Sequence, residues 1–311
     1  MSVLAPIGTY IASAAGTLLV GLALRWYDRK LTARLQWRKG PPWYQPIADV
    51  LKLLLCKETL IPSTARGTGF LIAPVIALSS VAVVAGLLWS VLIYRTTVVG
   101  DLIVVIYLLL IPPLMTILGA SASGSPHAAI GASREMKLIL CYELPFVLAL
   151  LVPVIHAKWS LQIGEMIRYT PLYSVSGVIA MIVAIFAAQA KLGQVPFDIA
   201  EAECEIMGGV IVEYSGAPLA MIYLTRAMLL AVMPLLLITV FWGGIEFTFM
   251  GILAFIGKYL LLVTITTLIR NTNPRLRIDQ AMRFYWMTLT PAAVIAVILA
   301  IIGYSRAIGW L

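Results

Sequence analysis

Eight long apolar runs constrain this chain more than any other feature of its sequence. They cover residues 4–26, 70–94, 101–121, 136–156, 172–193, 217–243, 249–270 and 285–305. The hydrocarbon core of a bilayer needs about 20 apolar residues for each helical crossing. Only 12% of the residues are charged, whereas about 25% is usual in a soluble domain. The runs therefore predict an all-α, polytopic membrane protein with about eight transmembrane helices, in a single membrane domain over residues 1–311.

The distribution of lysine and arginine predicts how these helices are oriented. Of the 22 cationic residues, Arg226 and Lys258 lie inside runs. Arg95, Lys158, Arg168 and Arg306 lie on one predicted side, which leaves sixteen in the connections on the other side. Because cytoplasmic connections carry the excess of cations, both chain termini are expected outside. The net charge of +8 then follows from topology and gives no support to nucleic-acid binding.

The first internal connection, residues 27–69, contains an amphipathic segment. Its apolar residues recur at helical spacing and comprise Ile47, Val50, Leu51, Leu54 and Leu55. This pattern predicts a helix that lies in the membrane interface. Trp37, Trp43 and Tyr44 alternate with nearby cations, so the connection is interpreted either as a basic loop on anionic lipid or as a protein docking surface. Arginine and aromatic residues are enriched at protein interfaces.

Together with 194–216 and 271–284, residues 27–69 form the predicted docking face. Three arginines in 271–284, together with Arg270 just before them, surround a single aspartate. Positive-inside anchoring explains these arginines but not the apolar residues between them. The candidate docking residues are Arg34, Arg38, Trp43, Arg275, Arg277 and Asp279.

The stretch Gln194–Gly216 concentrates carboxylates in a chain with only 14 acidic residues. Pro196 followed by Asp198 and Glu201 predicts a helix start with Asp198 as the N-cap, which would place Asp198, Glu201 and Glu205 on one face. Neighbouring like charges and burial raise carboxyl pKa values. The cluster is therefore predicted to relay protons, and a solvated acidic loop and a site for a basic partner remain as alternatives. Its acids are Asp198, Glu201, Glu203, Glu205 and Glu213.

Three single charges interrupt the apolar runs, namely Glu143, Arg226 and Lys258. A charge at the bilayer centre costs at least ~2.5 kcal/mol, so such residues usually mark an ion path or pair with one another. Glu143 is interpreted as a further proton relay group. The alternative is a structural ion pair between Glu143 and either Lys258 or Arg226.

Redox cofactors are not expected in this chain. Cys56, Cys141 and Cys204 are isolated, and His127 and His156 are the two histidines. These residues lack the spacing of a haem, iron–sulfur or zinc site. Any redox chemistry is therefore assigned to partner proteins.

Three separated segments resemble the NuoH-like membrane subunit of respiratory complex I and its relatives. They are "DRKLTARLQWRKGPPWYQPIADVLKLLLCKE", "QVPFDIAEAECEIMGGVIVEYSG" and "NPRLRIDQAMRFYW", and with the eight runs the resemblance covers nearly the whole chain. Two departures from complex I members, the short "GPPWYQP" loop and the "ASREMKLILCYELP" start of the fourth run, are similar to the anchor subunits of group 4 energy-converting nickel–iron hydrogenases.

This resemblance implies a membrane anchor that catalyses nothing alone. It would couple ferredoxin-linked hydrogen evolution to ion translocation in the cell membrane of a bacterium or archaeon. The implied partners are a hydrogenase-like large subunit with a nickel–iron centre, an iron–sulfur small subunit and antiporter-like membrane subunits. By motif, the five acids of the 194–216 stretch match the family's acidic loop, and Glu143 matches its fourth-span glutamate. A quinone-reducing complex I subunit, a sulfane-sulfur reductase anchor and a stand-alone ion carrier remain as alternatives.

Overall fold

The computed structural model describes residues 4–65, 67–95, 101–306 and 310. Over these residues it consists of helices, with no strand and one isolated bridge between Asp101 and Gln162. Seven helices are long and apolar enough to cross a membrane, and the shorter α7 corresponds to the remaining predicted run. The long helices are α1 (Leu4–Leu35), α3 (Gly67–Tyr94), α4 (Leu102–Ala122), α5 (Pro126–His156), α9 (Gly216–Phe241), α10 (Phe249–Thr272) and the α11–α12 unit over Ile278–Arg306. The predicted architecture is confirmed.

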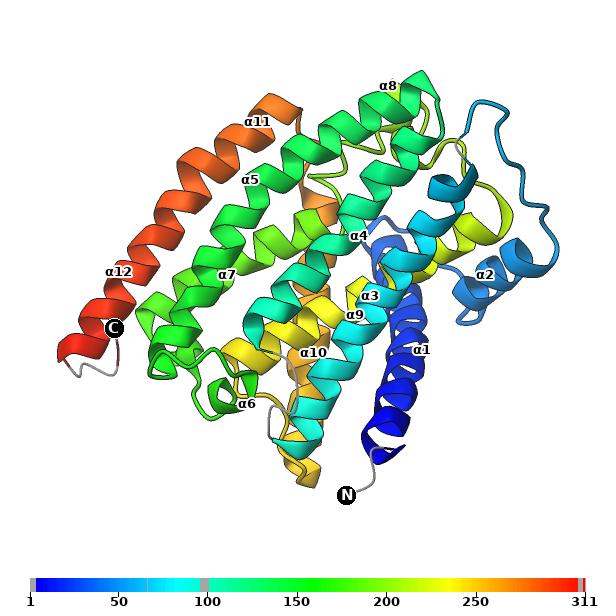
Figure 1. Cartoon of the computed structure of the whole chain (residues 1–311). Helices are drawn as coiled ribbons and strands as arrows, with labels where there is room; N and C mark the ends of the chain where they lie inside the picture. The colour runs from blue at the N-terminus through cyan, green and yellow to red at the C-terminus, as the bar shows by residue number, and fades with distance from the viewer. Residues whose placement is uncertain (1–3, 66, 96–100, 307–309, 311) are drawn as a thin grey trace.

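The short elements connect the long helices, and in Figure 1 α8 lies at one end of this bundle, α6 at the other end and α2 at its side. They are α2 (Gln45–Leu55), α6 (Ile163–Met166), η1 (Pro171–Tyr173), α8 (Glu203–Ile206) and η2 (Gly209–Ile211). α7 spans Val175–Lys191. Helix α1 begins, and α12 (Thr290–Arg306) ends, at the end of the bundle opposite to α8 and α11 (Figure 1).

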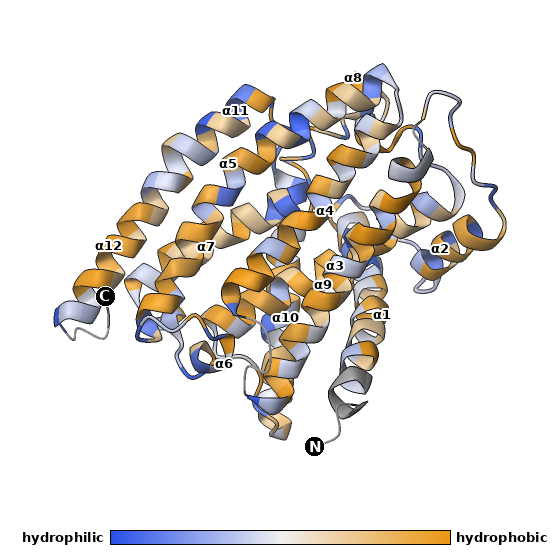
Figure 2. Cartoon of the chain, in the orientation of Figure 1, coloured by the Kyte–Doolittle hydropathy of each residue, from blue (hydrophilic) through white to orange (hydrophobic). Residues whose placement is uncertain are grey.

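Helix α9 is the centre of the bundle. In the most apolar 18-residue stretch of α9, 89% of the residues are buried, whereas the buried share of the corresponding stretch is 22% in α1 and 28% in α10. Figure 2 shows apolar residues along the length of the long helices, with hydrophilic residues gathered toward their ends. The outward-facing residues of α1, α10 and α12 are thus apolar without being buried by this chain, as expected for helices that face lipid or other membrane subunits.

The amphipathic segment forms α2, as the spacing of its apolar residues predicts. Pro46 occupies the first turn, where its missing N–H costs nothing. Val50 packs into a small cluster with Leu22 of α1 and Ala227 of α9. An ion pair of 2.9 Å joins Arg29 to Asp49. Helix α2 is therefore fixed against α1 and α9.

The helix predicted to start at Asp198 does not form. Residues 198–202 form no helix. α8 begins at Glu203 with Ala202 as its N-cap, and Met207 and Gly208 then take positive φ values of 54° and 94°. The prediction was wrong because the carboxylate of Asp198 binds an arginine of a distant loop instead of capping a local helix. Tertiary contacts override the local capping signal here.

The last span contains a π-helical turn. Residues Ile278–Arg283 form α11, Phe284–Leu289 form the turn, and α12 follows directly. Tyr285, on this turn, is fully buried and donates a hydrogen bond of 2.8 Å to the carbonyl of Phe186 in α7. The turn thereby directs an aromatic side chain between α5 and α7, a use that is frequent for π-helical insertions near functional sites.

Candidate functional site

A cavity of about 70 Å³ lies among α3, α4, α5, α7, α9 and the loop that follows α7. Its walls are partly apolar, with Pro74, Pro112 and Pro113 among them. Its polar lining gathers acids and bases from distant parts of the sequence: Glu135, Lys191, Asp198, Glu201 and Arg226, together with Thr116, Thr225 and Tyr214. We refer to this space as the internal cavity.

The loop packs against α5 at Gly131 and folds closely on itself at Gly209. A Cβ atom on Gly131 of α5 would lie 2.8 Å from the backbone nitrogen of Val210 and 2.9 Å from the carbonyl oxygen of Ala200. Gly209 has a φ of 49° and also lies against the carbonyl of Ala200. Only residues without a Cβ allow this close backbone approach.

Tyr214 anchors the far end of the loop. Its ring stacks on Phe70 of α3 with centroids 4.2 Å apart, and its hydroxyl donates a hydrogen bond of 3.2 Å to the carbonyl of Phe70. Burial raises the pKa of Tyr214 to about 12, so the hydroxyl remains a neutral donor. Tyr214 thus attaches the end of the acidic loop to α3 beside the internal cavity.

Two of the five predicted loop acids line the internal cavity, and each pairs with an arginine. Glu201 forms an ion pair with Arg226 of α9. Asp198 accepts a hydrogen bond of 2.7 Å from Arg275 in the last internal loop. Burial raises the pKa of Asp198, against the opposing effect of Arg275 and Arg226. Its Oδ1 atom is buried without a hydrogen-bond partner in the described residues.

The other three loop acids lie outside the cavity lining. Glu203 and Glu205 are exposed, and Glu205 pairs with Arg134 of α5 at 2.5 Å. Glu213 is half-buried next to Tyr214. The loop therefore divides into a cavity-facing pair and a group directed toward the end of the bundle.

Glu143 pairs with a lysine that the sequence had assigned to an internal connection. Lys191 Nζ, at the end of α7, lies 2.6 Å from Glu143 Oε2. Lys191 also lies over the rings of Tyr142 and Phe146 at 5.4 and 4.9 Å. The suggested pairing of Glu143 with Lys258 or Arg226 is wrong, because Arg226 pairs with Glu201 and Lys258 donates to the carbonyl of Trp242.

Lys258 has a separate environment on α10. Its Nζ donates a hydrogen bond of 3.2 Å to the carbonyl of Trp242 and lies 5.3 Å from that indole ring. Arg226, by contrast, belongs to the internal cavity through Glu201. The two predicted intramembrane cations are therefore not parts of one cluster.

Glu135 lines the internal cavity and was missed by the sequence analysis. The fourth apolar run was bounded at residue 136, whereas α5 begins ten residues earlier at Pro126. Glu135 and Glu143 are eight residues apart on this helix, which separates them by about 12 Å along its axis. An acid two turns before an intramembrane acid was an available signal.

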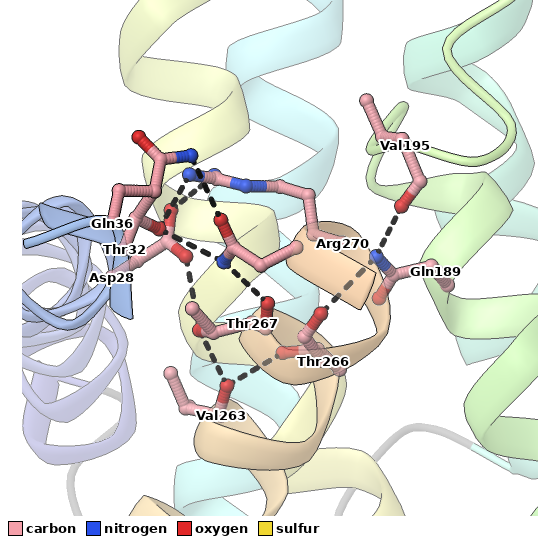
Figure 3. Close-up of polar contacts among 10 residues, drawn as sticks. Asp28, Thr32, Gln36, Gln189, Val195, Val263, Thr266, Thr267 and Arg270 are labelled. Carbon is pink, nitrogen blue, oxygen red and sulfur yellow. Dashed lines mark hydrogen bonds and ion pairs between the residues drawn. The ribbon is translucent and has the colours of Figure 1, made fainter. Parts of the chain in front are cut away.

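A second polar cluster, also missed, joins α1 to α10 (Figure 3). Asp28, buried on α1, accepts hydrogen bonds from Arg270 Nη1 at 2.5 Å and from Thr267 Oγ1 at 2.9 Å. Thr32 accepts from Arg270 and from Asn271. On the other side of α10, Gln189 of α7 donates to the carbonyls of Thr266 and Val195. The cluster connects α1, α10 and the start of the acidic loop.

The predicted docking residues are all exposed, at the end of α1, in α11 and on the adjoining loops: Arg34, Arg38, Trp43, Arg275, Arg277 and Asp279. The loops 194–216 and 271–284 are bonded together, because Leu276 N donates to the carbonyl of Pro196 and Arg275 pairs with Asp198. Asp198 is thus tied to the last loop by its ion pair and by the neighbouring backbone hydrogen bond. Among the described residues, no cluster of three or more His, Cys, Asp or Glu side chains could hold a metal ion.

Known proteins share this sequence pattern and this fold. A family model described as NADH dehydrogenase matches residues 9–301. The chain is 32% identical to the H subunit of NADH-quinone oxidoreductase from Dehalococcoides mccartyi, over 92% of this chain and 83% of that protein. It is 33% identical to the same subunit from Anoxybacillus flavithermus, over 93% and 92%. Among solved structures it is similar to a chain of the membrane-bound sulfane sulfur reductase, an archaeal respiratory membrane complex, with 30% identity, a TM-score of 0.86, and 95% and 99% of the two chains covered.

Proposed function

Because this chain belongs to the NADH dehydrogenase family of NuoH-like membrane subunits of respiratory complexes, we propose that it couples electron transfer in a peripheral partner to ion translocation. The chain is a multi-pass membrane protein. In this proposal the docking face lies in the cytoplasm, both termini lie outside, and the membrane is the plasma membrane of a bacterium or archaeon. The chain supplies the protonatable path and binds the partner, and it has no redox chemistry of its own.

The proposed path starts at the docking face and runs through the internal cavity. A change of charge or shape in the partner would act on Arg275 and release or tighten its hold on Asp198. Asp198 and Glu201 would then exchange protons with water in the cavity, and Glu143 would receive the change deeper in the bundle. Glu203, Glu205 and Glu213 would collect protons at the docking face. Neighbouring antiporter-like subunits would respond to the charge on Glu143.

We propose that the partner is a nickel–iron hydrogenase-like large subunit with an iron–sulfur small subunit. Reduced ferredoxin would supply the electrons, and protons would be reduced to hydrogen at the partner's nickel–iron centre. The short loop at Gly40–Pro46 and the Ala132–Pro145 segment, whose forms are similar to those of group 4 hydrogenase anchors, support this partner. Co-purification of the complex, with assay of hydrogen evolution from reduced ferredoxin, tests it.

The sulfane-sulfur reductase partner is the second candidate, and one observation favours it. The chain and its archaeal structural relative match over nearly their whole lengths. Sulfane-sulfur reduction without hydrogen evolution by the purified complex would replace the hydrogenase partner. Labelling of this chain, within the complex, by a photoreactive quinone analogue would instead support a quinone-reducing partner. Metal analysis of the co-purified large subunit, including the number of its cysteine ligands, separates the first two partners. Ion flux driven by the purified chain alone in liposomes would instead support a stand-alone carrier.

The observation that carries the coupling role is the placement of ionisable groups from four elements around one internal cavity, with the Glu143–Lys191 pair beyond it. Glu143→Gln in the assembled complex should preserve electron transfer and abolish the membrane potential generated per electron. Glu165→Gln provides the matched control, because Glu165 is a partly exposed acid in α6 at the opposite end of the bundle. An unchanged potential per electron in Glu143→Gln would refute the coupling role.

A further inference from the structure

Lys191 lies between the internal cavity and Glu143. Its side chain is 2% exposed, it lines the internal cavity, and its Nζ atom lies 2.6 Å from Glu143 Oε2. The Glu143 side chain is 19% exposed and is absent from the cavity lining. Within the described residues, the lysine thus provides the polar contact between the cavity and the intramembrane carboxylate.

Two buried oxygen atoms beside this pair have no protein hydrogen-bond partner among the described residues. They are Tyr142 Oη and Glu143 Oε1, and Tyr142 is fully buried. Buried polar atoms without a protein partner are usually satisfied by water. Water at these positions would extend the polar connection beyond the Oε2 atom that contacts Lys191.

We propose that Lys191 is a proton carrier that transfers a proton from the internal cavity to Glu143. The inference rests on the proposed coupling function and deepens it. In the step, an N–H bond of the Lys191 ammonium breaks and an O–H bond forms on Glu143 Oε2, which leaves a neutral amine beside a neutral carboxylic acid. The amine then accepts a proton from a water molecule in the cavity, and a cavity acid donates a proton to that water molecule in turn. No electrons change hands.

The groups around Lys191 are suited to this step. Four groups line the same cavity as Lys191, namely Glu135 from α5, Asp198 and Glu201 from the loop, and Arg226 from α9. The ring of Tyr142 of α5 contacts Lys191, and Tyr285 contacts Tyr142 from the π-helical turn. Arg226 and Lys191 are the two cations of the described cavity lining. A guanidinium stays protonated in proteins, whereas a lysine amine can release its proton. Arg226 therefore keeps its positive charge beside the acids, whereas Lys191 can transfer a proton.

Lys191→Arg in the assembled complex separates proton transfer from charge pairing. The guanidinium retains the charge that balances Glu143, so the complex should assemble and transfer electrons when an ionophore removes the potential. Because arginine does not release the proton, the potential generated per electron should fall by roughly tenfold or more. The matched control is Lys258→Arg, which makes the same exchange at an intramembrane lysine that contacts Trp242 away from the cavity. It should keep full coupling.

The outcomes separate the two proposals. If Glu143→Gln abolishes coupling and Lys191→Arg retains it, the carrier role of Lys191 is overturned while the coupling function stands. If Glu143→Gln retains coupling, the coupling function itself fails. Should Lys191→Arg not assemble, infrared difference spectra of the unaltered complex labelled with ¹⁵N-lysine decide. An isotope-sensitive loss of a lysine ammonium band must accompany the carboxyl band that Glu143→Gln removes, and its absence overturns the proposal.

Discussion

Arg270 of α10 holds Asp28 of α1 through a hydrogen bond of 2.5 Å between Nη1 and Oδ2 (Figure 3). The carboxylate side chain is 5% exposed and also accepts from Thr267. Both helices lie at the periphery of the bundle, where few of their residues are buried. A lipid environment provides no hydrophobic force that presses helices together, so polar contacts and close packing fix their positions. The pair therefore fixes the position of α1 relative to α10, near the end of α1 that leads to the docking face.

Replacing Asp28 with alanine should destabilise the protein strongly. The change leaves Arg270 charged and partly buried without its partner, and breaking such a pair costs roughly 3–5 kcal/mol of unfolding free energy. Asp49→Ala is the matched control, because Asp49 and Arg29 are each 38% exposed, and exposed pairs contribute about 0–1 kcal/mol. Thermal unfolding of the detergent-solubilised chain measures both. Equal losses would show that burial does not decide the strength of these pairs.

Stability should depend on pH with opposite signs at Asp198 and Asp49. Burial raises the pKa of Asp198, so the folded state binds this proton more tightly than the unfolded chain. Its contribution is fully present below the ordinary aspartate pKa and is lost as pH rises through the raised value. Burial also acts on Asp49, but hydrogen bonds from Arg29 and Gln45 lower the pKa of Asp49 overall. Its contribution is present above the ordinary pKa and is lost as pH falls through the lowered value.

Unfolding midpoints over an acidic pH series test these signs. Relative to the unaltered chain, Asp198→Asn should reduce the loss of stability on raising the pH, and Asp49→Asn should reduce the loss on lowering it. The same direction of change in both variants would contradict the assigned shifts.

Gly131→Ala should displace the acidic loop. The added methyl group would meet the backbone of Ala200 and Val210, and overpacking of this kind costs about 1–3 kcal/mol. Gly257→Ala is the control, because it also lies within a long helix but has open space where the added methyl group would lie; there the change should stay within about 1 kcal/mol. Hydrogen exchange at residues 200–210 should accelerate in Gly131→Ala alone. Unchanged exchange would mean that the loop does not depend on this close approach.

The spans and α2 could be predicted from the sequence because their causes are local. A helix in lipid satisfies its own backbone hydrogen bonds, so run length suffices. The spacing from Ile47 to Leu55 predicts the amphipathic helix α2, of whose five periodic apolar residues this chain buries Val50 and leaves the others exposed. The loop conformation at Asp198 was mispredicted because Arg275, 77 residues away, competes for its carboxylate. The capping signal describes only neighbours in sequence.

The partner of Glu143 could not be predicted for a related reason. Several helices carry a cation, and sequence spacing does not indicate which of them faces Glu143. Lys191 was assigned to a connection because it ends its helix, yet the fold buries it. Glu135 was overlooked because α5 extends beyond its apolar run. Charges at the ends of apolar runs thus need the three-dimensional structure before a role can be assigned.

Reversing charge on the first internal loop should release the peripheral partner without affecting the membrane fold. Arg34 and Arg38 are exposed and have no ion-pair partner in the described residues, and Trp37 beside them is 98% exposed. A partner that binds this cationic face presents negative charges to it. Double replacement by glutamate would set two negative charges against them, and like-charge contacts oppose association. The large and small partner subunits should then fail to co-purify with the membrane subunits. Lys158→Glu, an exposed cation next to α5 at the opposite end, should retain them, and equal unfolding midpoints of all three chains would assign the loss to the interface. Full co-purification of the double variant would mean that these cations face lipid headgroups instead.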